Sequence, residues 1–178
     1  IQSYYPVSIL FRKILLPCIL IYIFVLPLIL RILPLQKIYF GHKFSLSEIV
    51  YVWVSGIVTM LLVVNVVLKN MWGRVRPNDV SYFGGFQDFT PWYKISNACA
   101  SNCSFVSGDS SVGFLLIVFY FITKKNNYLY LGLILGCLLG FIRIAAGGHF
   151  FSDIIFSQIV VSVTTLVSFV LYKKLYDK

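Results

Sequence analysis

Residues 141–153 read FIRIAAGGHFFSD and separate two apolar runs, at about residues 127–142 and 154–172. Each run approaches the roughly 20 apolar residues that a helix needs to cross a bilayer core about 30 Å thick. The connection between them nevertheless carries three ionisable side chains, Arg143, His149 and Asp153. The stretch therefore predicts two membrane-spanning helices joined by a short polar segment.

Three further apolar runs lie at about residues 14–30, 49–68 and 111–123. The last of them is short, so we extend its helix back to about Ser107, where small polar residues would face the protein interior. The composition agrees, because 59% of the 178 residues are hydrophobic and only 12% are charged, which excludes an ordinary soluble domain. We predict an all-α, polytopic membrane helix bundle with five transmembrane helices, forming one domain over residues 1–178.

Cations around the apolar runs indicate how the helices are oriented. They form three groups, in two connections and at the end of the chain: Arg31, Lys37 and Lys43; Lys124 and Lys125; Lys173, Lys174 and Lys178. Counting helices puts all three groups on one side, which the positive-inside rule assigns to the cytoplasm. Residues 69–106 and 141–153 then lie together on the opposite, outer side.

The same count puts the N-terminus on the outer side. Because the sequence begins with Ile1 and shows no cleavable signal pattern, we expect a sixth helix to precede the five. Arg12 and Lys13 run against the positive-inside rule, and two explanations stay open. They either snorkel towards the membrane surface or line the polar site.

The four cysteines fall into two pairs. Cys18 and Cys137 lie within apolar runs and are expected to be packing residues. Cys99 and Cys103 lie in the outer segment, where an oxidising environment would allow a disulfide that braces the loop. A gap of three residues demands a particular backbone geometry, so a disulfide and two free thiols both stay open.

The segment from Lys69 to about Phe105 is the longest polar interruption. Two prolines and two glycines exclude one continuous helix over it: Pro77, Gly84, Gly85 and Pro91. Its aromatic residues, Trp92 and Tyr93 among them, suit a segment at the level of the lipid headgroups. A surface lid without chemistry would explain the aromatic residues equally well, but it would not explain the cations at the start of the segment.

Three polar clusters share the outer side in this arrangement: KNMWGRVRP at 69–77, SFVSGDSS at 104–111 and RIAAGGHFFSD at 143–153. The first and third clusters supply four cations: Lys69, Arg74, Arg76 and Arg143. Guanidinium groups match the oxygens of a phosphate in paired hydrogen bonds. This density of cations therefore favours a phosphate group as the ligand.

Two of the clusters contain further features suited to phosphate chemistry. Ser107 and Gly108 fall where the third helix should begin, so their backbone N–H groups can point at an anion. His149 and Asp153 are four residues apart, which on a helix puts them on one face about one turn apart. The carboxylate could then accept a hydrogen bond from one imidazole nitrogen and leave the other free to attack phosphorus.

Each of these residues also has an ordinary structural explanation. A single histidine near a helix start is more often part of the framework, Lys69 alone is more often a headgroup anchor, and Ser107 alone is more often a helix cap. Ionisable groups cost about 2.5 to 3.5 kcal/mol each at the centre of a membrane helix, so they tend to persist only where they work or pair. Taken together, the residues favour a phosphate site.

The order and spacing of these residues resemble the type 2 phosphatidic acid phosphatase (PAP2) superfamily over residues 69–153. The matching elements are Lys-x6-Arg-Pro at Lys69 and Arg76-Pro77, the Ser-Gly core at Ser107-Gly108, and a third element at Arg143, His149 and Asp153. The resemblance implies a six-helix membrane phosphatase that needs no metal and no cofactor. It also implies that His149 is the nucleophile, that Asp153 orients it, and that phosphate is bound by Lys69, Arg76, Ser107, Gly108 and Arg143.

The sequence departs from the superfamily at two positions. Where the family usually has Pro-Ser-Gly-His, with a histidine that protonates the leaving oxygen, this chain reads VSGD at residues 106–109. Asp109 could take over as the catalytic general acid only if it is protonated before the transfer; otherwise it is a first-turn acid that favours the helix dipole. Ile142 stands where the family usually has a serine before Arg143, a change that we expect to be mild.

The stretches WGRVRP, FGG, FTPW and NCSFVSGD resemble a bacterial branch of the superfamily that includes the lipid A phosphatases, and specifically the lipid A 4'-phosphatases. This resemblance implies a phosphate monoester on a lipid headgroup as substrate, either lipid A or a phospholipid. It also implies a multi-pass protein of the bacterial inner membrane with its active site facing the periplasm. We expect membrane lipids and no nucleic acid as partners, and we expect Arg74 and residues 78–102 to contact the headgroup.

Other functions would use the same residues. A phosphatidylglycerophosphate or undecaprenyl pyrophosphate phosphatase fits the core residues equally well, and a lipid phosphotransferase would differ only in what attacks the phosphohistidine. A lipid-binding or transport scaffold gains weight from Asp109, whereas the five apolar runs argue against a soluble haloperoxidase-like protein. The sequence leaves the exact lipid, the position of the phosphate and the oligomeric state open.

Overall fold

The computed structural model describes residues 5–33, 35 and 41–176 of the chain. Lys37 and Lys178, two of the cations that orient the predicted helices, lie outside the described residues. Within the described ranges the chain is helical and forms no strand, and extended backbone pairs only in a single bridge between Val80 and Gln87.

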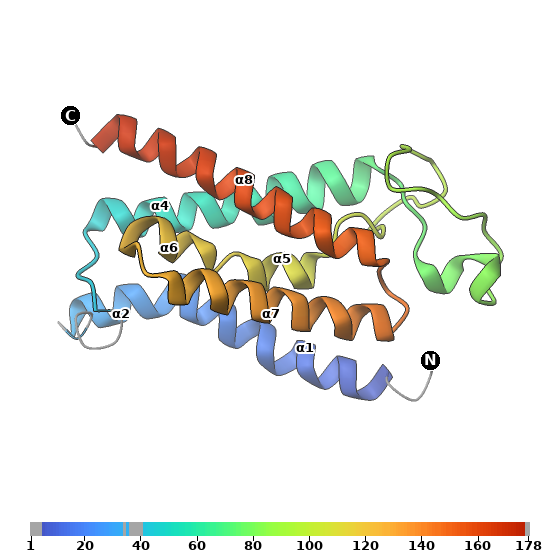
Figure 1. Ribbon diagram of the computed structural model, residues 1–178, viewed down its shortest axis with the longest axis horizontal. Helices are drawn as coiled ribbons and strands as arrows, with labels where there is room; N and C mark the ends of the chain where they lie inside the picture. The colour runs from blue at the N-terminus through green and yellow to red at the C-terminus, as the bar shows by residue number, and fades with distance from the viewer. Residues whose placement is uncertain (1–4, 34, 36–40, 177–178) are drawn as a thin grey trace.

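Helices follow the five apolar runs, and three of the five rods are built from more than one helical segment (Figure 1). In chain order the segments are α1 (Tyr5–Leu20), the π-helix η2 (Ile21–Val25), α2 (Leu26–Ile32), α4 (Leu46–Ile57), the π-helix η3 (Val58–Asn70), α5 (Gly108–Phe114), α6 (Ile117–Thr123), α7 (Asn126–Ala145) and α8 (Phe151–Tyr176). The predicted all-α membrane bundle is confirmed.

Four of the rods are long and apolar enough to cross a membrane: Arg12–Ile32, Leu46–Asn70, Asn126–Ala145 and Phe151–Tyr176. The fifth, Gly108–Thr123, is a shorter apolar helix, roughly 24 Å long at 1.5 Å per residue. Its first residue agrees with the predicted extension of the third helix back to about Ser107. The chain is a multi-pass membrane protein whose shortest helix begins at the predicted phosphate site.

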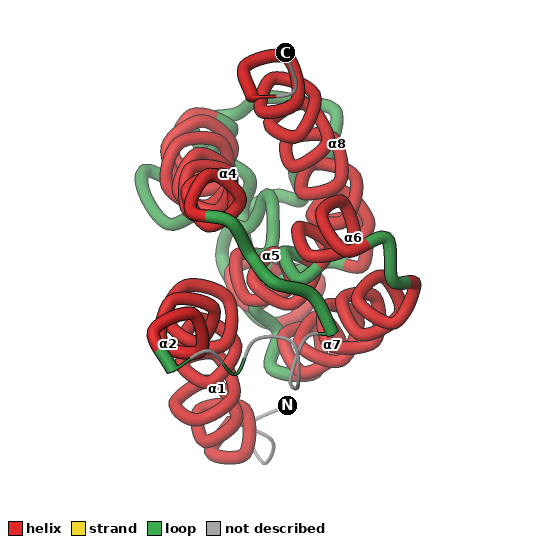
Figure 2. Tube along the Cα trace, turned by 90° about the vertical axis from the view of Figure 1, so that its left-hand side faces the viewer, coloured by secondary structure: helices red, strands yellow, loops and turns green. Residues whose placement is uncertain are grey.

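Helix α5 lies at the centre of the bundle and contacts α1, η3, α7 and α8 (Figure 2). A glycine allows the close approach to α7, because a Cβ added at Gly113 would lie 2.6 Å from the Cα of Gly136. At its start, the hydroxyls of Ser111 and Ser157 donate to the carbonyl of Ser107 at 2.8 and 2.9 Å. Small residues and internal hydrogen bonds are typical of helix contacts inside a membrane. They fix the N-terminus of α5 against α8.

The connections sort to two opposite ends of the bundle, as the helix count predicts. At one end, Arg31 donates to the carbonyl of Phe44 at 2.5 Å, and the ammonium groups of Lys124 and Lys173 lie 4.7 and 5.9 Å from the ring centre of Phe169. The other end holds the α7–α8 connection and the long loop after η3, in which two short turns occur, η4 (Pro77–Asp79) and η5 (Ser81–Phe83) (Figure 1). As predicted, the loop forms no continuous helix, and it shares an end with residues 146–150.

Candidate active site

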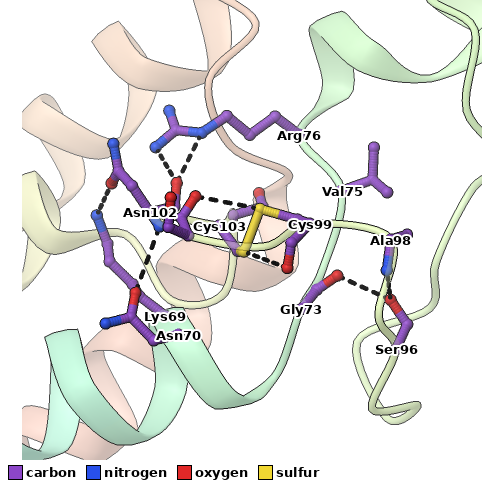
Figure 3. Close-up of a disulfide and its surroundings, with 12 residues drawn as sticks. Lys69, Asn70, Gly73, Val75, Arg76, Ser96, Ala98, Cys99, Asn102 and Cys103 are labelled. Carbon is purple, nitrogen blue, oxygen red and sulfur yellow. Dashed lines mark hydrogen bonds between the residues drawn. A yellow bond between two sulfur atoms is a disulfide. The ribbon is translucent and has the colours of Figure 1, made fainter.

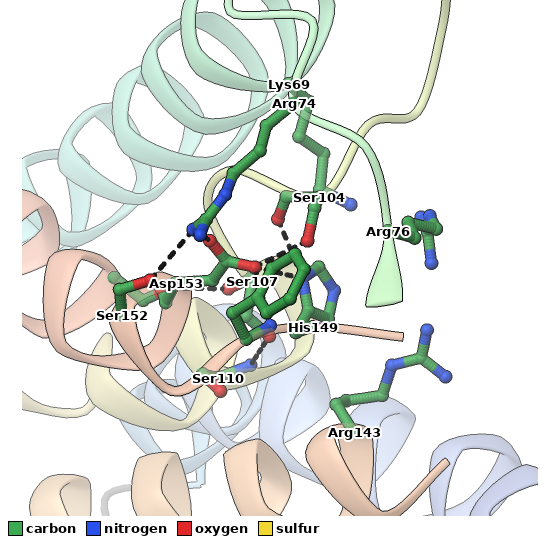
Figure 4. A network of polar contacts seen from close by, with 12 residues as sticks. Lys69, Arg74, Arg76, Ser104, Ser107, Ser110, Arg143, His149, Ser152 and Asp153 are labelled. Carbon is green, nitrogen blue, oxygen red and sulfur yellow. Dashed lines mark hydrogen bonds and ion pairs between the residues drawn. The ribbon is translucent and has the colours of Figure 1, made fainter. Parts of the chain in front are cut away.

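The three polar clusters of the sequence meet at the end of the bundle that holds the long loop (Figure 4). His149 Nδ1 lies 2.7 Å from the carbonyl oxygen of Ser104, which joins the third cluster to the second. Arg74 forms an ion pair with Asp153, which joins the third cluster to the first. Residues separated by up to 79 positions are therefore in direct contact.

His149 lies in the connection between α7 and α8, because α7 ends at Ala145 and α8 begins only at Phe151. The expectation that His149 and Asp153 share one helix is therefore wrong, although the two side chains are neighbours. Two glycines allow this path. Gly147 has a φ of 68°, and a Cβ on Gly148 would overlap the guanidinium group of Arg143. The chain therefore turns tightly around the arginine and presents the histidine beside it.

The hydrogen bond at Nδ1 fixes the state of the imidazole. A carbonyl oxygen can only accept, so Nδ1 of His149 carries the proton and donates to Ser104. Burial lowers the pKa of His149, and the neighbouring carboxylate of Asp153 opposes this shift only in part. The positive charges of Lys69 and Arg143 lower the pKa further. The ring is therefore neutral near pH 7, with the lone pair on Nε2, the form that can act as a nucleophile.

Asp153 supports the histidine, largely through other groups. Its Oδ2 is 3.5 Å from His149 Nδ1, farther than the Ser104 carbonyl. The same oxygen accepts from the Ser104 hydroxyl at 2.5 Å and from the Phe150 backbone N–H at 2.9 Å. Asp153 thus holds the residue whose carbonyl orients the imidazole. Sequence reasoning gave Ser104 no role, and no sequence signal could have done so, because the group that orients His149 is a backbone carbonyl.

Arg74 is buried, with only 1% of its surface exposed. Besides the ion pair with Asp153, it donates to the Ser152 hydroxyl at 2.8 Å and to the Thr90 carbonyl at 3.0 Å. Its guanidinium carbon lies 4.3 Å from the ring centre of Phe150. The structure therefore places Arg74 in the support of Asp153, away from the exposed surface where a headgroup contact was expected.

Lys69 and Arg76 meet at Asn102 (Figure 3). Lys69 Nζ donates to the side-chain oxygen of Asn102 at 3.2 Å, while Nε and Nη2 of Arg76 donate to its backbone carbonyl at 3.1 and 2.6 Å. A disulfide between Cys99 and Cys103 closes the short loop that carries Asn102. Of the two states that the sequence left open for these cysteines, the structure has the disulfide. The disulfide loop thus holds two predicted phosphate-binding cations.

Ser107 and Gly108 lie at the start of α5. The Ser107 hydroxyl caps the helix by accepting from the Ser110 backbone N–H at 3.4 Å, and the Ser107 N–H donates to the Asp153 carbonyl at 3.4 Å. A Cβ on Gly108 would lie 3.4 Å from Lys69 Nζ, so the ammonium group lies directly over this turn. The structure brings both residues to the site, where the Ser107 N–H is already in use within the protein.

A cavity of about 230 Å³ opens among three arginines, Arg12, Arg76 and Arg143, and its wall is completed by Ile9, Asn78, Ala146 and Gly148. A water molecule takes up about 30 Å³ of liquid, so the cavity has room for a phosphate group. Of the two explanations left open for Arg12, the structure supports the one in which it lines the polar site. The sequence signal for Arg12 was its conflict with the positive-inside rule.

Asp109 is in the first turn of α5, beside these arginines. Its Oδ2 lies 2.8 Å from Arg12 Nε and 3.3 Å from Arg143 Nε. The carboxylate is therefore held between two arginines that line the cavity. Within the described ranges, no group of three or more His, Cys, Asp or Glu side chains could hold a metal ion.

One end of this helical membrane bundle brings together a buried neutral histidine, a supporting aspartate and cations from separate segments. This arrangement fits a class of membrane phosphatases. The chain belongs to the PAP2 superfamily, which residues 50–177 match. The match extends from α4 to the end of α8 and leaves Arg12 outside it.

Within this superfamily the chain is similar to proteins named lipid A 4'-phosphatase. It is 44% identical over 118 residues to that of Francisella tularensis subsp. novicida (strain U112), which covers 64% of this chain and 53% of the relative. It is 38% identical over 98 residues to that of Rhizobium leguminosarum, which covers 53% of this chain and 42% of the relative. The chain thus spans about half the length of these curated relatives, or less. No solved structure gives a significant match.

Proposed function

We propose that this protein is a lipid phosphatase that hydrolyses a phosphate monoester on a lipid headgroup, with the 4'-phosphate of lipid A as its substrate. The observation that carries the proposal is the state of His149: Nδ1 is fixed by the Ser104 carbonyl at 2.7 Å, and the buried ring is neutral among phosphate-binding cations. The names of the relatives support lipid A as the lipid.

In the first half of the reaction, the phosphate enters the cavity of Arg12, Arg76 and Arg143. Lys69 of η3, whose ammonium group lies over the start of α5, adds a further positive charge. Nε2 of His149 attacks phosphorus, and the bond from phosphorus to the lipid oxygen breaks. The cations neutralise the charge that spreads over the equatorial oxygens in the transition state. A proton from Asp109 completes the leaving alcohol.

In the second half, water attacks the phosphohistidine. Asp109, now ionised, accepts a proton from the attacking water, and inorganic phosphate leaves. The hydrogen bond from Nδ1 to Ser104 keeps the ring aligned through both halves, because the phosphoryl group occupies only Nε2. The mechanism requires no metal and no cofactor.

We place the protein in the inner membrane of a bacterium, with the site facing the periplasm. Two features support this orientation. The described cations at the opposite end of the bundle are Arg31 in the last turn of α2, Lys43 shortly before α4, Lys124 at the end of α6 and Lys173 in the last turn of α8. This is the charge distribution that the positive-inside rule requires of the cytoplasmic side. The disulfide lies at the end that carries the site, and disulfides persist in oxidising compartments such as the periplasm.

The test is phosphate release by the purified protein from three lipids: lipid A, phosphatidylglycerophosphate and undecaprenyl pyrophosphate. We expect lipid A to be the best substrate and His149→Ala to abolish release. Comparable rates on all three lipids would contradict a specialist for lipid A. A lipid product that carries the transferred phosphate would instead identify a phosphotransferase.

A scaffold without catalytic activity predicts no release from any of the lipids. A folded wild-type protein that binds lipid A but releases no phosphate would therefore overturn the proposed function. Acid-quenched protein should also carry phosphate on one histidine during turnover, and absence of this label from active enzyme would refute the covalent step.

A further inference from the structure

Arg12 reaches the site from an element outside the three motif clusters. It lies on α1, outside the region that matches the superfamily. Its guanidinium nevertheless lines the cavity together with Arg76 and Arg143. Because 45% of its side chain is exposed, Arg12 can still reach an incoming group.

Asp109 forms ion pairs with two of these arginines. One carboxylate oxygen lies 2.8 Å from Arg12 Nε and 3.3 Å from Arg143 Nε, and the Asp109 side chain is 14% exposed. Guanidinium groups bind carboxylate and phosphate oxygens with the same geometry. The carboxylate and a substrate phosphate therefore compete for the same guanidinium groups.

We propose that Arg12 is a further phosphate-binding residue, that Asp109 holds it at the cavity until the substrate arrives, and that its transfer to the phosphate releases Asp109 for proton transfer. The inference rests on the proposed function and deepens it. It gives a reason why an aspartate can stand where the superfamily usually has a histidine.

The reason is competition for the arginines. While Arg12 and Arg143 hold the Asp109 carboxylate, it is not free to exchange a proton with a bound phosphate. Arg12 on α1 and Arg143 on α7 contact Asp109, and Lys69 on η3 and Arg76 in the loop are close enough to interact with its charge. When a phosphate takes over these guanidinium groups, the carboxylate is released and can accept the proton that the phosphate brings.

The substrate supplies the proton that Asp109 later donates. A phosphate monoester loses its second proton near pH 6, so a fraction of it arrives as the monoanion. That proton passes to Asp109, which leaves a phosphate dianion bound to the arginines. When His149 attacks, the electron pair of the breaking phosphorus–oxygen bond moves to the leaving oxygen, and Asp109 returns the proton to it.

The experiment measures inhibition by inorganic phosphate and the kinetics of lipid dephosphorylation in matched variants. Arg12→Gln should raise both the inhibition constant of phosphate and the KM about tenfold, the loss of one charge-assisted contact. Arg12→Lys should recover part of the loss, because it restores the charge without the fork. Lys13→Gln removes an equal charge from the adjacent, exposed position and should leave both constants unchanged.

Substitution of Asp109 tests the competition itself. Asp109→Asn removes the rival anion, so phosphate should bind more tightly, by about threefold, while kcat falls. In the Arg12→Gln background the same substitution should tighten phosphate binding much less, since the arginine that it would release is absent. A merely structural ion pair would not produce this opposite movement of phosphate affinity and kcat.

Two outcomes would overturn the inference. One is that the inhibition constant of phosphate is unchanged in folded Arg12→Gln and Arg12→Lys protein. The other is that Asp109→Asn tightens phosphate binding equally in the presence and in the absence of Arg12. Failure of the proposed function looks different, because the wild-type protein would then release no phosphate from any lipid. Each variant is first compared with wild type by size-exclusion chromatography in detergent, so that a folding defect is recognised.

Discussion

Replacing Arg74 by methionine distinguishes a buried supporting residue from a headgroup ligand. Arg74 is 1% exposed and bonds to Asp153, Ser152 and Thr90. Methionine fills similar space but leaves the buried carboxylate of Asp153 without its ion-pair partner. Removing one partner of a buried ion pair costs about 3 to 5 kcal/mol, because the remaining charge is uncompensated.

For a protein of this size, 1 kcal/mol corresponds to about 2 to 4 °C in Tm, so Arg74→Met should lower Tm by roughly 6 to 20 °C. Thermal unfolding in detergent, followed by the fluorescence of the tryptophans, measures the shift. Arg74→Met combined with Asp153→Asn removes both charges and should recover part of the loss. Lys94→Met, an exposed cation of the same loop, is the control and should change Tm little.

The kinetics decide between the two roles. If Arg74 acts only by holding Asp153, activity measured well below the lowered Tm should lose kcat through misalignment of His149, with little change in KM. A Tm within about 2 °C of wild type together with a raised KM would show that Arg74 contacts the headgroup, and our account of its burial would be refuted.

The buried histidine, the disulfide and a crowded glycine each give a further test. Burial lowers the pKa of His149 from its usual value of 6.5, and the neutral ring is lost as the pH falls through the lowered value, so the acid limb of kcat/KM, which reports the free protein, should lie below pH 6.5. Reducing the disulfide between Cys99 and Cys103 frees the loop that carries Asn102 and should raise KM by up to about tenfold, measured by initial rates with and without dithiothreitol. Gly148→Ala pushes a methyl group into the adjacent guanidinium and should lower kcat/KM by about a hundredfold in the same assay.

Each of these tests has its own control. Cys18→Ala with Cys137→Ala removes the two free thiols, and the effect of reduction should persist in that variant. Gly84→Ala places a methyl group in open space at a φ of 92°, so it should cost stability without changing KM. An acid limb at or above pH 6.5 would contradict the effect of burial on His149. An unchanged KM after reduction would contradict the role of the disulfide loop. A fully active Gly148→Ala protein would contradict the close approach of Gly148 to Arg143.

Much of the fold could be predicted because membrane helices are encoded locally. Apolar runs near 20 residues fix where the helices lie, since an unpaired backbone group in hydrocarbon costs several kcal/mol. Counting those helices then assigns every connection to one end or the other. The long loop and residues 146–150 were in this way expected at the same end, where the structure places them.

Details of the site could not be predicted, because they depend on how helices rotate and where loops run. The sequence suggested a shared helix for His149 and Asp153, but α8 begins after the histidine. The role of Ser104 depends on a backbone carbonyl, a group that every residue carries. Arg74 and Arg76 are two positions apart and look alike in the sequence, yet one is buried against Asp153 and the other lines the cavity.

The sequence by itself determined that this is a helical membrane protein and which residue types gather at one face, because hydrophobic length and helix count are properties of the chain alone. Only the tertiary structure decided which atoms meet: the disulfide at Asn102, the carbonyl at His149, and the arginine of α1 beside Asp109. The contacts at His149 and Asp109 join residues far apart in the chain over distances of about 3 Å, so a helix rotated by one residue, about 100°, would break them.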